Sequence, residues 1–193
     1  MKNAITKPFE TLQETKLFFI GSLLLVAGSL FAFLTNTRFD GVLDMHLTSQ
    51  IQWYQPLIDN IVNTLCLTVT LFILSRFLPT KARLIDIFNV ALICRVPFYF
   101  SLFVNIGNIQ QETTDFLVAN LHNPTMITEL PFINLFLFGL SALVGLTALV
   151  FMGFLLYRGY KNATNSKQAS HHVLLIVAVL LAEVVSKLLV YLY

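Results

Sequence analysis

The stretch from Leu17 to Leu34, LFFIGSLLLVAGSLFAFL, decides the fold class because it carries no charged residue over the length of a membrane crossing. A spanning helix needs about 20 mostly apolar residues, since each residue rises about 1.5 Å and the hydrocarbon core is about 30 Å thick. The stretch is too long, and lies too deep in the chain, for the core of a signal peptide. The sequence therefore predicts a helix that stays in the membrane.

Four further apolar stretches of similar length follow, at Leu57 to Leu78, Leu84 to Val104, Phe132 to Tyr157 and Val173 to Tyr193. Hydrophobic residues make up 56% of the 193 residues and charged residues only 11%, against about a quarter in soluble domains. We therefore expect an all-α, polytopic membrane bundle of about five helices, forming one domain over residues 17–193. Residues 1–16 are predicted to be either a short amphipathic helix on the membrane surface or a solvated tail.

The positive charges fall in alternate connections between these helices. Nine of them precede the first helix or follow the second and fourth: Lys2, Lys7, Lys16, Arg76, Lys81, Arg83, Arg158, Lys161 and Lys167. The other two connections, residues 35–56 and 105–131, hold only Arg38. Because Lys and Arg are retained on the cytoplasmic side, we expect the N-terminus inside and the C-terminus outside. The apolar stretches 42–47 and 116–121 are expected to lie on the outer membrane surface.

Four charged residues stand out inside the predicted spans: Asp59, Arg95, Glu183 and Lys187. Asp86 also lies in a span, but in its first turn, where a helix N-terminus favours an anion, and we interpret it as structural. A charge at the bilayer centre costs about 2.5 to 3.5 kcal/mol on insertion scales, so such residues are candidate functional groups. Arg95 lies 11 residues after Leu84, and Glu183 lies 11 residues after His172, in helices that run in the same direction. The two side chains are therefore expected at one depth, where a salt bridge would neutralise both.

Further polar residues extend this pair into a predicted polar seam. Lys187 is one helical turn beyond Glu183, and Asp59, Asn60 and Asn63 open the second helix at the same outer level. The seam has two interpretations: it registers the helices during assembly, or it lines a pathway. Pro97, two residues after Arg95, removes a backbone donor and is a candidate hinge.

Small residues mark where helices can approach closely, and the fourth helix carries Gly139, Ser141 and Gly145. Ser141 and Gly145 have the small-xxx-small spacing of close helix contacts in membranes. We favour packing within the chain over a homo-oligomer contact.

The sequence contains no Gly-rich phosphate loop, no His-Glu-x-x-His pair and no Gly-x-Ser-x-Gly elbow. It predicts no catalytic residue, no cofactor and no metal ligand set. The formal net charge of +2 does not favour nucleic acid as a partner. An intramembrane enzyme would need a nucleophile and a base at one depth, and no such pair stands out.

Three segments resemble the bacterial members of the Yip1 family of five-helix membrane proteins. The run Lys7-Pro8-Phe9-Glu10-Thr11-Leu12 is similar to the lead that opens many of them. Residues 155–181 resemble their final cytoplasmic turn. This segment contains Tyr157-Arg158-Gly159-Tyr160-Lys161-Asn162-Ala163-Thr164 and Ser166-Lys167. Residues 84–98 resemble their third helix with its Pro97. The resemblance implies no catalytic residues. Eukaryotic relatives carry a long N-terminal region and are associated with small GTPases; this chain lacks that region.

Two functions follow as hypotheses. The favoured one is a nonenzymatic protein of a bacterial cytoplasmic membrane that acts through helix contacts, as a scaffold or as an accessory subunit of a transport or trafficking complex. Its partners would be the lipid bilayer and other membrane proteins. The alternative is a small oligomeric transporter or channel with a polar path through Arg95, Glu183, Lys187 and Asp59. Charge neutralisation at Glu183 and Arg95 would separate the two.

Overall fold

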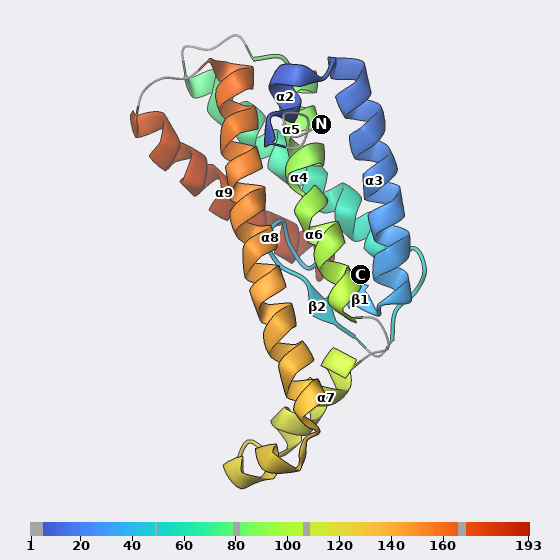
Figure 1. Ribbon diagram of the computed structural model, residues 1–193. Coiled ribbons are helices and arrows are strands. Elements are labelled where there is room, and N and C mark those ends of the chain that lie inside the picture. Colours follow the sequence, from blue (N-terminus) through green and yellow to red (C-terminus); the bar gives the residue numbers. More distant parts are fainter. Residues whose placement is uncertain (1–5, 49, 79–81, 106–108, 166–168) are drawn as a thin grey trace.

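The structure is a computed structural model that describes residues 6–48, 50–78, 82–105, 109–165 and 169–193 (Figure 1). It confirms an all-α chain with five segments long and apolar enough to cross a membrane. Four of these segments are single helices: α3 (Glu14–Leu34), α4 (Gln55–Phe77), α8 (Phe132–Thr164) and α9 (Ala169–Val190). The fourth helix continues seven residues beyond the predicted Tyr157, because its last two turns emerge from the apolar part as a polar helix end.

The third span is interrupted near its middle. It consists of α5 (Leu84–Cys94), α6 (Val96–Ser101) and the 3₁₀ turn η1 (Leu102–Asn105), and the break falls at Arg95. Pro97 occupies the first turn of α6, where its missing N–H is tolerated. The predicted disturbance at Pro97 is therefore present as a helix break at Arg95.

This third span is the centre of the bundle. It packs against α3, α4 and α8, while α9 packs mainly against α4 (Figure 1). Two glycines of α3 permit the close approach: a Cβ on Gly21 would lie 2.8 Å from Cβ of Leu92, and one on Gly28 would collide with the ring of Tyr99. Of the most apolar stretch of the third span, 72% is buried within the protein, against 11% for α8. The bundle is thus built around α5 and α6, with α8 on its outside.

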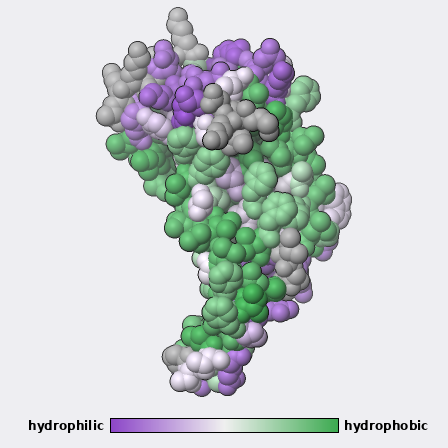
Figure 2. All heavy atoms as spheres, viewed as in Figure 1, coloured by the Kyte–Doolittle hydropathy of each residue, from purple (hydrophilic) through white to green (hydrophobic). Residues whose placement is uncertain are grey.

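Both ends of the molecule are hydrophilic, and an apolar band separates them (Figure 2). At one end Arg83 ion-pairs with Glu14 and with Asp86, and Arg158 ion-pairs with Glu10 at 3.0 Å. We call this the basic end, since the described cations of the predicted cytoplasmic connections belong to it. The predicted charges Lys2, Lys81 and Lys167 lie outside the described residues.

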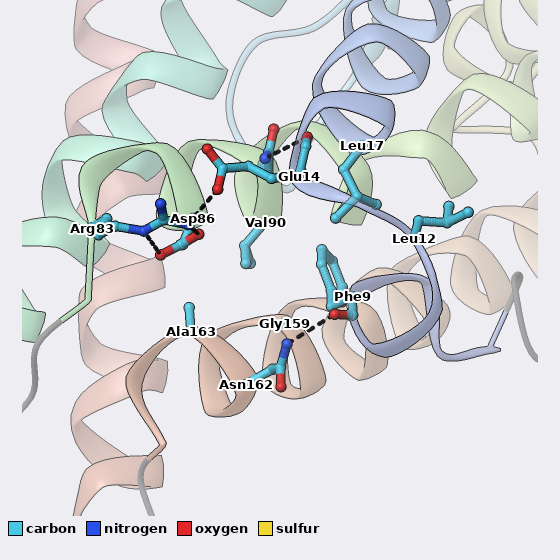
Figure 3. A pocket seen from close by; sticks show the side chains of 11 residues that line it. Phe9, Leu12, Glu14, Leu17, Arg83, Asp86, Val90, Gly159, Asn162 and Ala163 are labelled. Atoms are coloured by element: carbon cyan, nitrogen blue, oxygen red, sulfur yellow. Dashed lines mark hydrogen bonds and ion pairs between the residues drawn. The ribbon is translucent and has the colours of Figure 1, made fainter.

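The N-terminal segment packs onto the basic end of the bundle. Its one-turn helix α2 (Pro8–Thr11) places Phe9 against Gly159 of α8, and Asn162 donates a hydrogen bond to the Phe9 carbonyl at 2.9 Å. A pocket of about 210 Å³ lies between α2, α5 and α8, with Arg83 at its rim (Figure 3). This segment therefore packs on the bundle through Pro8 and Phe9, while most of residues 6–16 stay exposed, and its place on the membrane surface stays a prediction. Residues 1–5 are outside the described part of the chain.

The opposite end is formed by α7 (Ile109–Ala119) and the 3₁₀ turn η2 (Pro124–Glu129), which follow one another before α8 begins. Helix α7 packs against α8, and the two project beyond the rest of the bundle (Figure 1). The half of α8 next to α7 therefore extends beyond the ends of the other spans (Figure 1).

Candidate functional site

The connection between α3 and α4 folds back between the spanning helices. Residues 35–48, which we call the inserted loop, include an antiparallel pair of two-residue strands, β1 (Thr37–Arg38) and β2 (His46–Leu47). Phe39 and Val42 between the strands are 1% and 0% exposed. The expectation that the apolar stretch from Val42 lies on the membrane surface is therefore wrong for its buried first residue. Irregular backbone at membrane depth is tolerated only where protein or a water-filled cavity surrounds it.

The tip of the loop is held by the two charged residues at the predicted common depth. Arg95 Nη1 donates a hydrogen bond to the Val42 carbonyl at 3.0 Å, and Glu183 Oε2 accepts one from the Leu43 N–H at 2.7 Å. That carbonyl and that N–H belong to the same peptide group, and in a trans peptide they point in opposite directions. Arg95 and Glu183 thus lie on either side of one peptide bond.

The predicted salt bridge between Arg95 and Glu183 is wrong. Although both residues are described, they do not form an ion pair with each other, because the loop tip occupies the space between them. Arg95 is 1% exposed, and its other partners are the Gly41 carbonyl at 3.4 Å and Asn60 Oδ1 at 2.9 Å. Its guanidinium also lies 5.8 Å from the centroid of the Phe39 ring, a cation–π distance.

Gly41 is required where the loop meets α9. A Cβ built on Gly41 would overlap the carboxylate of Glu183, so no larger residue fits without displacing one of the two. The next residue is bound from the same helix, because Ser186 Oγ accepts the Val42 N–H at 3.2 Å. Helix α9 therefore supplies consecutive acceptors for the N–H groups of Val42 and Leu43.

Helix α4 holds the first strand of the loop. Asp59, which is fully buried, accepts Arg38 Nε at 3.1 Å and Arg38 Nη2 at 2.9 Å, a bidentate pair. The Tyr193 hydroxyl donates to the same carboxylate at 2.8 Å. One turn along α4, Asn63 Nδ2 donates to the Phe39 carbonyl at 2.9 Å. This cluster fastens the C-terminal end of the chain to both β1 and α4.

The outer edge of the loop carries two further ion pairs. Lys187 Nζ lies 2.6 Å from Asp44 Oδ2 and 3.5 Å from Glu183 Oε1. His46 Nδ1 lies 2.6 Å from Asp40 Oδ2, and this hydrogen bond raises the pKa of His46 above its ordinary value of 6.5. Both pairs are partly exposed, so solvent screens them more than the contacts at the loop tip.

All five residues predicted to form the seam, Asp59, Asn63, Arg95, Glu183 and Lys187, contact the inserted loop. Sequence reasoning missed Arg38, Asp44, Ser186 and Tyr193 as partners. The charges of Arg38 and Asp44 were visible in the sequence, but both were assigned to an outer connection. A regular spanning helix satisfies its own backbone, whereas this loop has peptide groups that need side-chain partners. Five polar side chains in the spans were therefore a signal that irregular backbone lies at their depth.

The predicted close packing of α8 is absent at two of its three small residues in the described chain. A Cβ built on Gly139 or Gly145 would have no atom within 4 Å, and Ser141 bonds only to the Phe138 carbonyl of its own helix at 2.6 Å. The expectation that this stretch packs within the chain is thus not met at either glycine. The face that bears Ser141 and Gly145 continues the side on which Ala148 and Met152 are buried, since these residues recur at helical spacing.

Within the described part of the chain, no group of three or more His, Cys, Asp or Glu side chains is placed to hold a metal ion. Comparison with protein-family models, with curated proteins and with solved structures finds no match to this chain. The resemblance to the Yip1 family therefore stays a prediction.

Proposed function

We propose that this protein is a nonenzymatic, multi-pass membrane protein of Yip1-like type that acts through helix contacts, as a scaffold or an accessory subunit of a transport or trafficking complex. We assign it to a bacterial cytoplasmic membrane, with the basic end on the cytoplasmic side and the C-terminus outside, because nine of the ten cations assigned to the connections fall in alternate segments of the sequence.

The observation that carries the proposal is that most of the apolar surface of α8 is exposed. Only 11% of its most apolar stretch is buried against the rest of the protein, although the helix is the longest in the described chain. Its outer half extends beyond the bundle together with α7 (Figure 1). Small residues let two helix backbones approach closely in a membrane, where van der Waals packing drives helix association. Ser141 and Gly145 supply such a surface on α8, where a Cβ built on Gly145 would have no atom of the described chain within 4 Å.

The contacts of the polar seam support a structural role for it. Each of Asp59, Arg95 and Glu183 bonds to the inserted loop, and Lys187 is paired with Asp44 and Glu183. A transport path needs polar groups that can exchange partners with a substrate. The transporter alternative loses support because these groups already serve the protein's own backbone.

The test is purification of the full chain at native expression in a mild detergent, with mass spectrometry of copurifying proteins and measurement of particle mass. Gly145→Leu and Ser141→Leu place bulk on the proposed contact face, and Thr147→Leu, on the opposite side of the same helix, is the matched control. A defined partner at fixed stoichiometry, lost in both face variants and kept in the control, supports the proposal. A monomer with no partner in the parent protein contradicts it.

A further inference from the structure

Helix α8 has a second notable surface, on the side that faces α9. Helices α8 and α9 are consecutive, yet α8 packs on α5 and α6 while α9 packs on α4, so the two diverge. Between them lies an apolar crevice of about 440 Å³, which we call the α8/α9 crevice. Its floor is formed by Met152, Leu156 and Leu175, all buried, and its walls include the exposed side chains of Ile176 and Leu180. The crevice therefore opens sideways, at the depth where lipid surrounds the protein.

The length of the crevice matches one leaflet. It runs along α8 from Leu149 to Tyr157 and along α9 from His172 to Leu180. Eight residues of helix correspond to about 12 Å, close to half of a hydrocarbon core about 30 Å thick. Leu43 of the inserted loop lines its deep end, beside Glu183, and its other end reaches the basic end of the bundle.

The shallow end carries a cluster suited to a phosphate group. Tyr157 and His172 contact edge to face with ring centroids 5.0 Å apart, and Lys161 Nζ lies 5.8 Å from the Tyr157 ring centroid. Among the described residues Lys161 has no carboxylate partner, in contrast to Arg158 on the same helix, which is paired with Glu10. Basic groups at the end of a groove between membrane helices are the arrangement that binds anionic lipid headgroups.

We propose that the α8/α9 crevice binds one anionic phospholipid of the leaflet at the basic end. One acyl chain lies on Met152, Leu156 and Leu175 and ends at Leu43, while the phosphate lies beside Lys161, His172 and the Tyr157 hydroxyl. The lipid would fill the space between two helices that the protein's own packing leaves apart. Its contact with Leu43 would place it next to the peptide group that Arg95 and Glu183 hold.

Gly153 offers a precise way to block the crevice. It lines the crevice, and a Cβ built on it meets no atom within 4 Å, so a side chain at this position starts in open space and Gly153→Leu extends into the crevice. Gly145→Leu is the matched control, because Gly145 lies on the same helix in equally open surroundings but outside the crevice. For the headgroup, Lys161→Gln is compared with Lys16→Gln, an exposed lysine of α3 at the same end.

The experiment reconstitutes the full chain in nanodiscs of equal parts phosphatidylglycerol and phosphatidylcholine and measures retained lipid by native mass spectrometry. The parent should retain one phosphatidylglycerol. Gly153→Leu should lose it, whereas Gly145→Leu keeps it. Lys161→Gln should reduce the preference for phosphatidylglycerol about fivefold, the effect expected for one basic residue near the surface, whereas Lys16→Gln leaves it unchanged.

Retention of the same lipid by Gly153→Leu, or equal loss in Gly145→Leu, would overturn the site. Equal retention of the two lipids by the parent would overturn the headgroup assignment. A second protein chain found in the crevice in place of lipid would overturn the assignment of a lipid as the occupant. The result is independent of the proposed function, since loss of a protein partner in Gly145→Leu with lipid retained separates the two surfaces.

Discussion

Arg95 and Glu183 bind opposite ends of one peptide group, the Val42 carbonyl at 3.0 Å and the Leu43 N–H at 2.7 Å. An unsatisfied backbone group in hydrocarbon costs several kcal/mol, so an irregular loop at this depth needs such partners. The two charges also interact through the dipole of the peptide between them, positive at the N–H facing the carboxylate and negative at the carbonyl facing the guanidinium. The seam and the inserted loop thus stabilise one another.

The first prediction concerns the guanidinium group of Arg95. Arg95→Met removes the N–H groups that donate to the Val42 carbonyl and to Asn60 Oδ1. It should lower the free energy of unfolding by about 3 kcal/mol or more. Arg95→Lys should recover only part of this loss, because one ammonium group does not reproduce the planar fork of a guanidinium. Denaturant unfolding in detergent micelles measures both, with Lys16→Met as an exposed control. An Arg95→Lys protein as stable as the parent would contradict the assigned contacts.

The second prediction uses two glycines in opposite surroundings. Gly41→Ala places a methyl group on the Glu183 carboxylate and should destabilise the protein by about 1 to 3 kcal/mol, the usual cost of overpacking. Gly139→Ala adds the same methyl group to an open helix surface and should be neutral or stabilising by up to about 1 kcal/mol. Thermal unfolding of both variants in one detergent gives the comparison. If both substitutions change the stability in the same direction, the assigned contact between Gly41 and Glu183 is wrong.

The third prediction is a pH dependence at the loop edge. The Asp40 carboxylate raises the pKa of His46, so the pair contributes stability that is fully present below about pH 6.5, the unfolded value, and is lost as pH rises through the raised pKa. The side chain is 47% exposed, so the effect should be at most about 1 kcal/mol. An NMR titration of His46 and melting curves from pH 5 to 9 test it.

His46→Gln is the control for this titration, since the other histidines remain. The difference in melting temperature between parent and variant should shrink as the pH rises. A constant difference over that range would show that the His46 and Asp40 contact does not depend on charge.

The fourth prediction separates the partners of Asp59. Tyr193→Phe removes one hydroxyl and leaves the bidentate pair with Arg38, so it should cost about 1 kcal/mol. Asp59→Ala leaves the Arg38 guanidinium, the Tyr193 hydroxyl and the Phe39 N–H without this acceptor and should cost about 3 to 5 kcal/mol. Unfolding of the single and double variants gives the coupling between Asp59 and Tyr193. Equal costs for the two single substitutions would contradict the geometry.

The spans were predictable because length and hydropathy are local properties of the sequence. The first helix begins at Glu14 rather than Leu17 and the last ends at Val190 rather than Tyr193, so these predicted spans differ from the helices by a few residues at their ends. The shared depth of Arg95 and Glu183 could also be read from residue spacing. These features need no knowledge of which distant residues meet.

The inserted loop could not be predicted in the same way. The partners of Val42 and Leu43 are Arg95, Ser186 and Glu183, which are far away in the sequence, and no periodicity encodes such pairings. Its stretch from Val42 to Leu47 also has the apolar character of a segment lying on a membrane surface. Its burial depends on satisfying individual peptide groups, which only the folded arrangement of α4, α6 and α9 makes possible.

The most direct test of the central claim, that the loop tip is enclosed by the bundle, is thiol labelling of Val42→Cys with Cys66 and Cys94 replaced. Gln52→Cys, on the exposed part of the same connection, is the control. A small polar maleimide should label Gln52→Cys rapidly in membranes and in mild detergent, and should leave Val42→Cys unlabelled until the protein is denatured. Equal labelling rates at the two positions would contradict insertion of the loop and, with it, the structural role of Arg95 and Glu183.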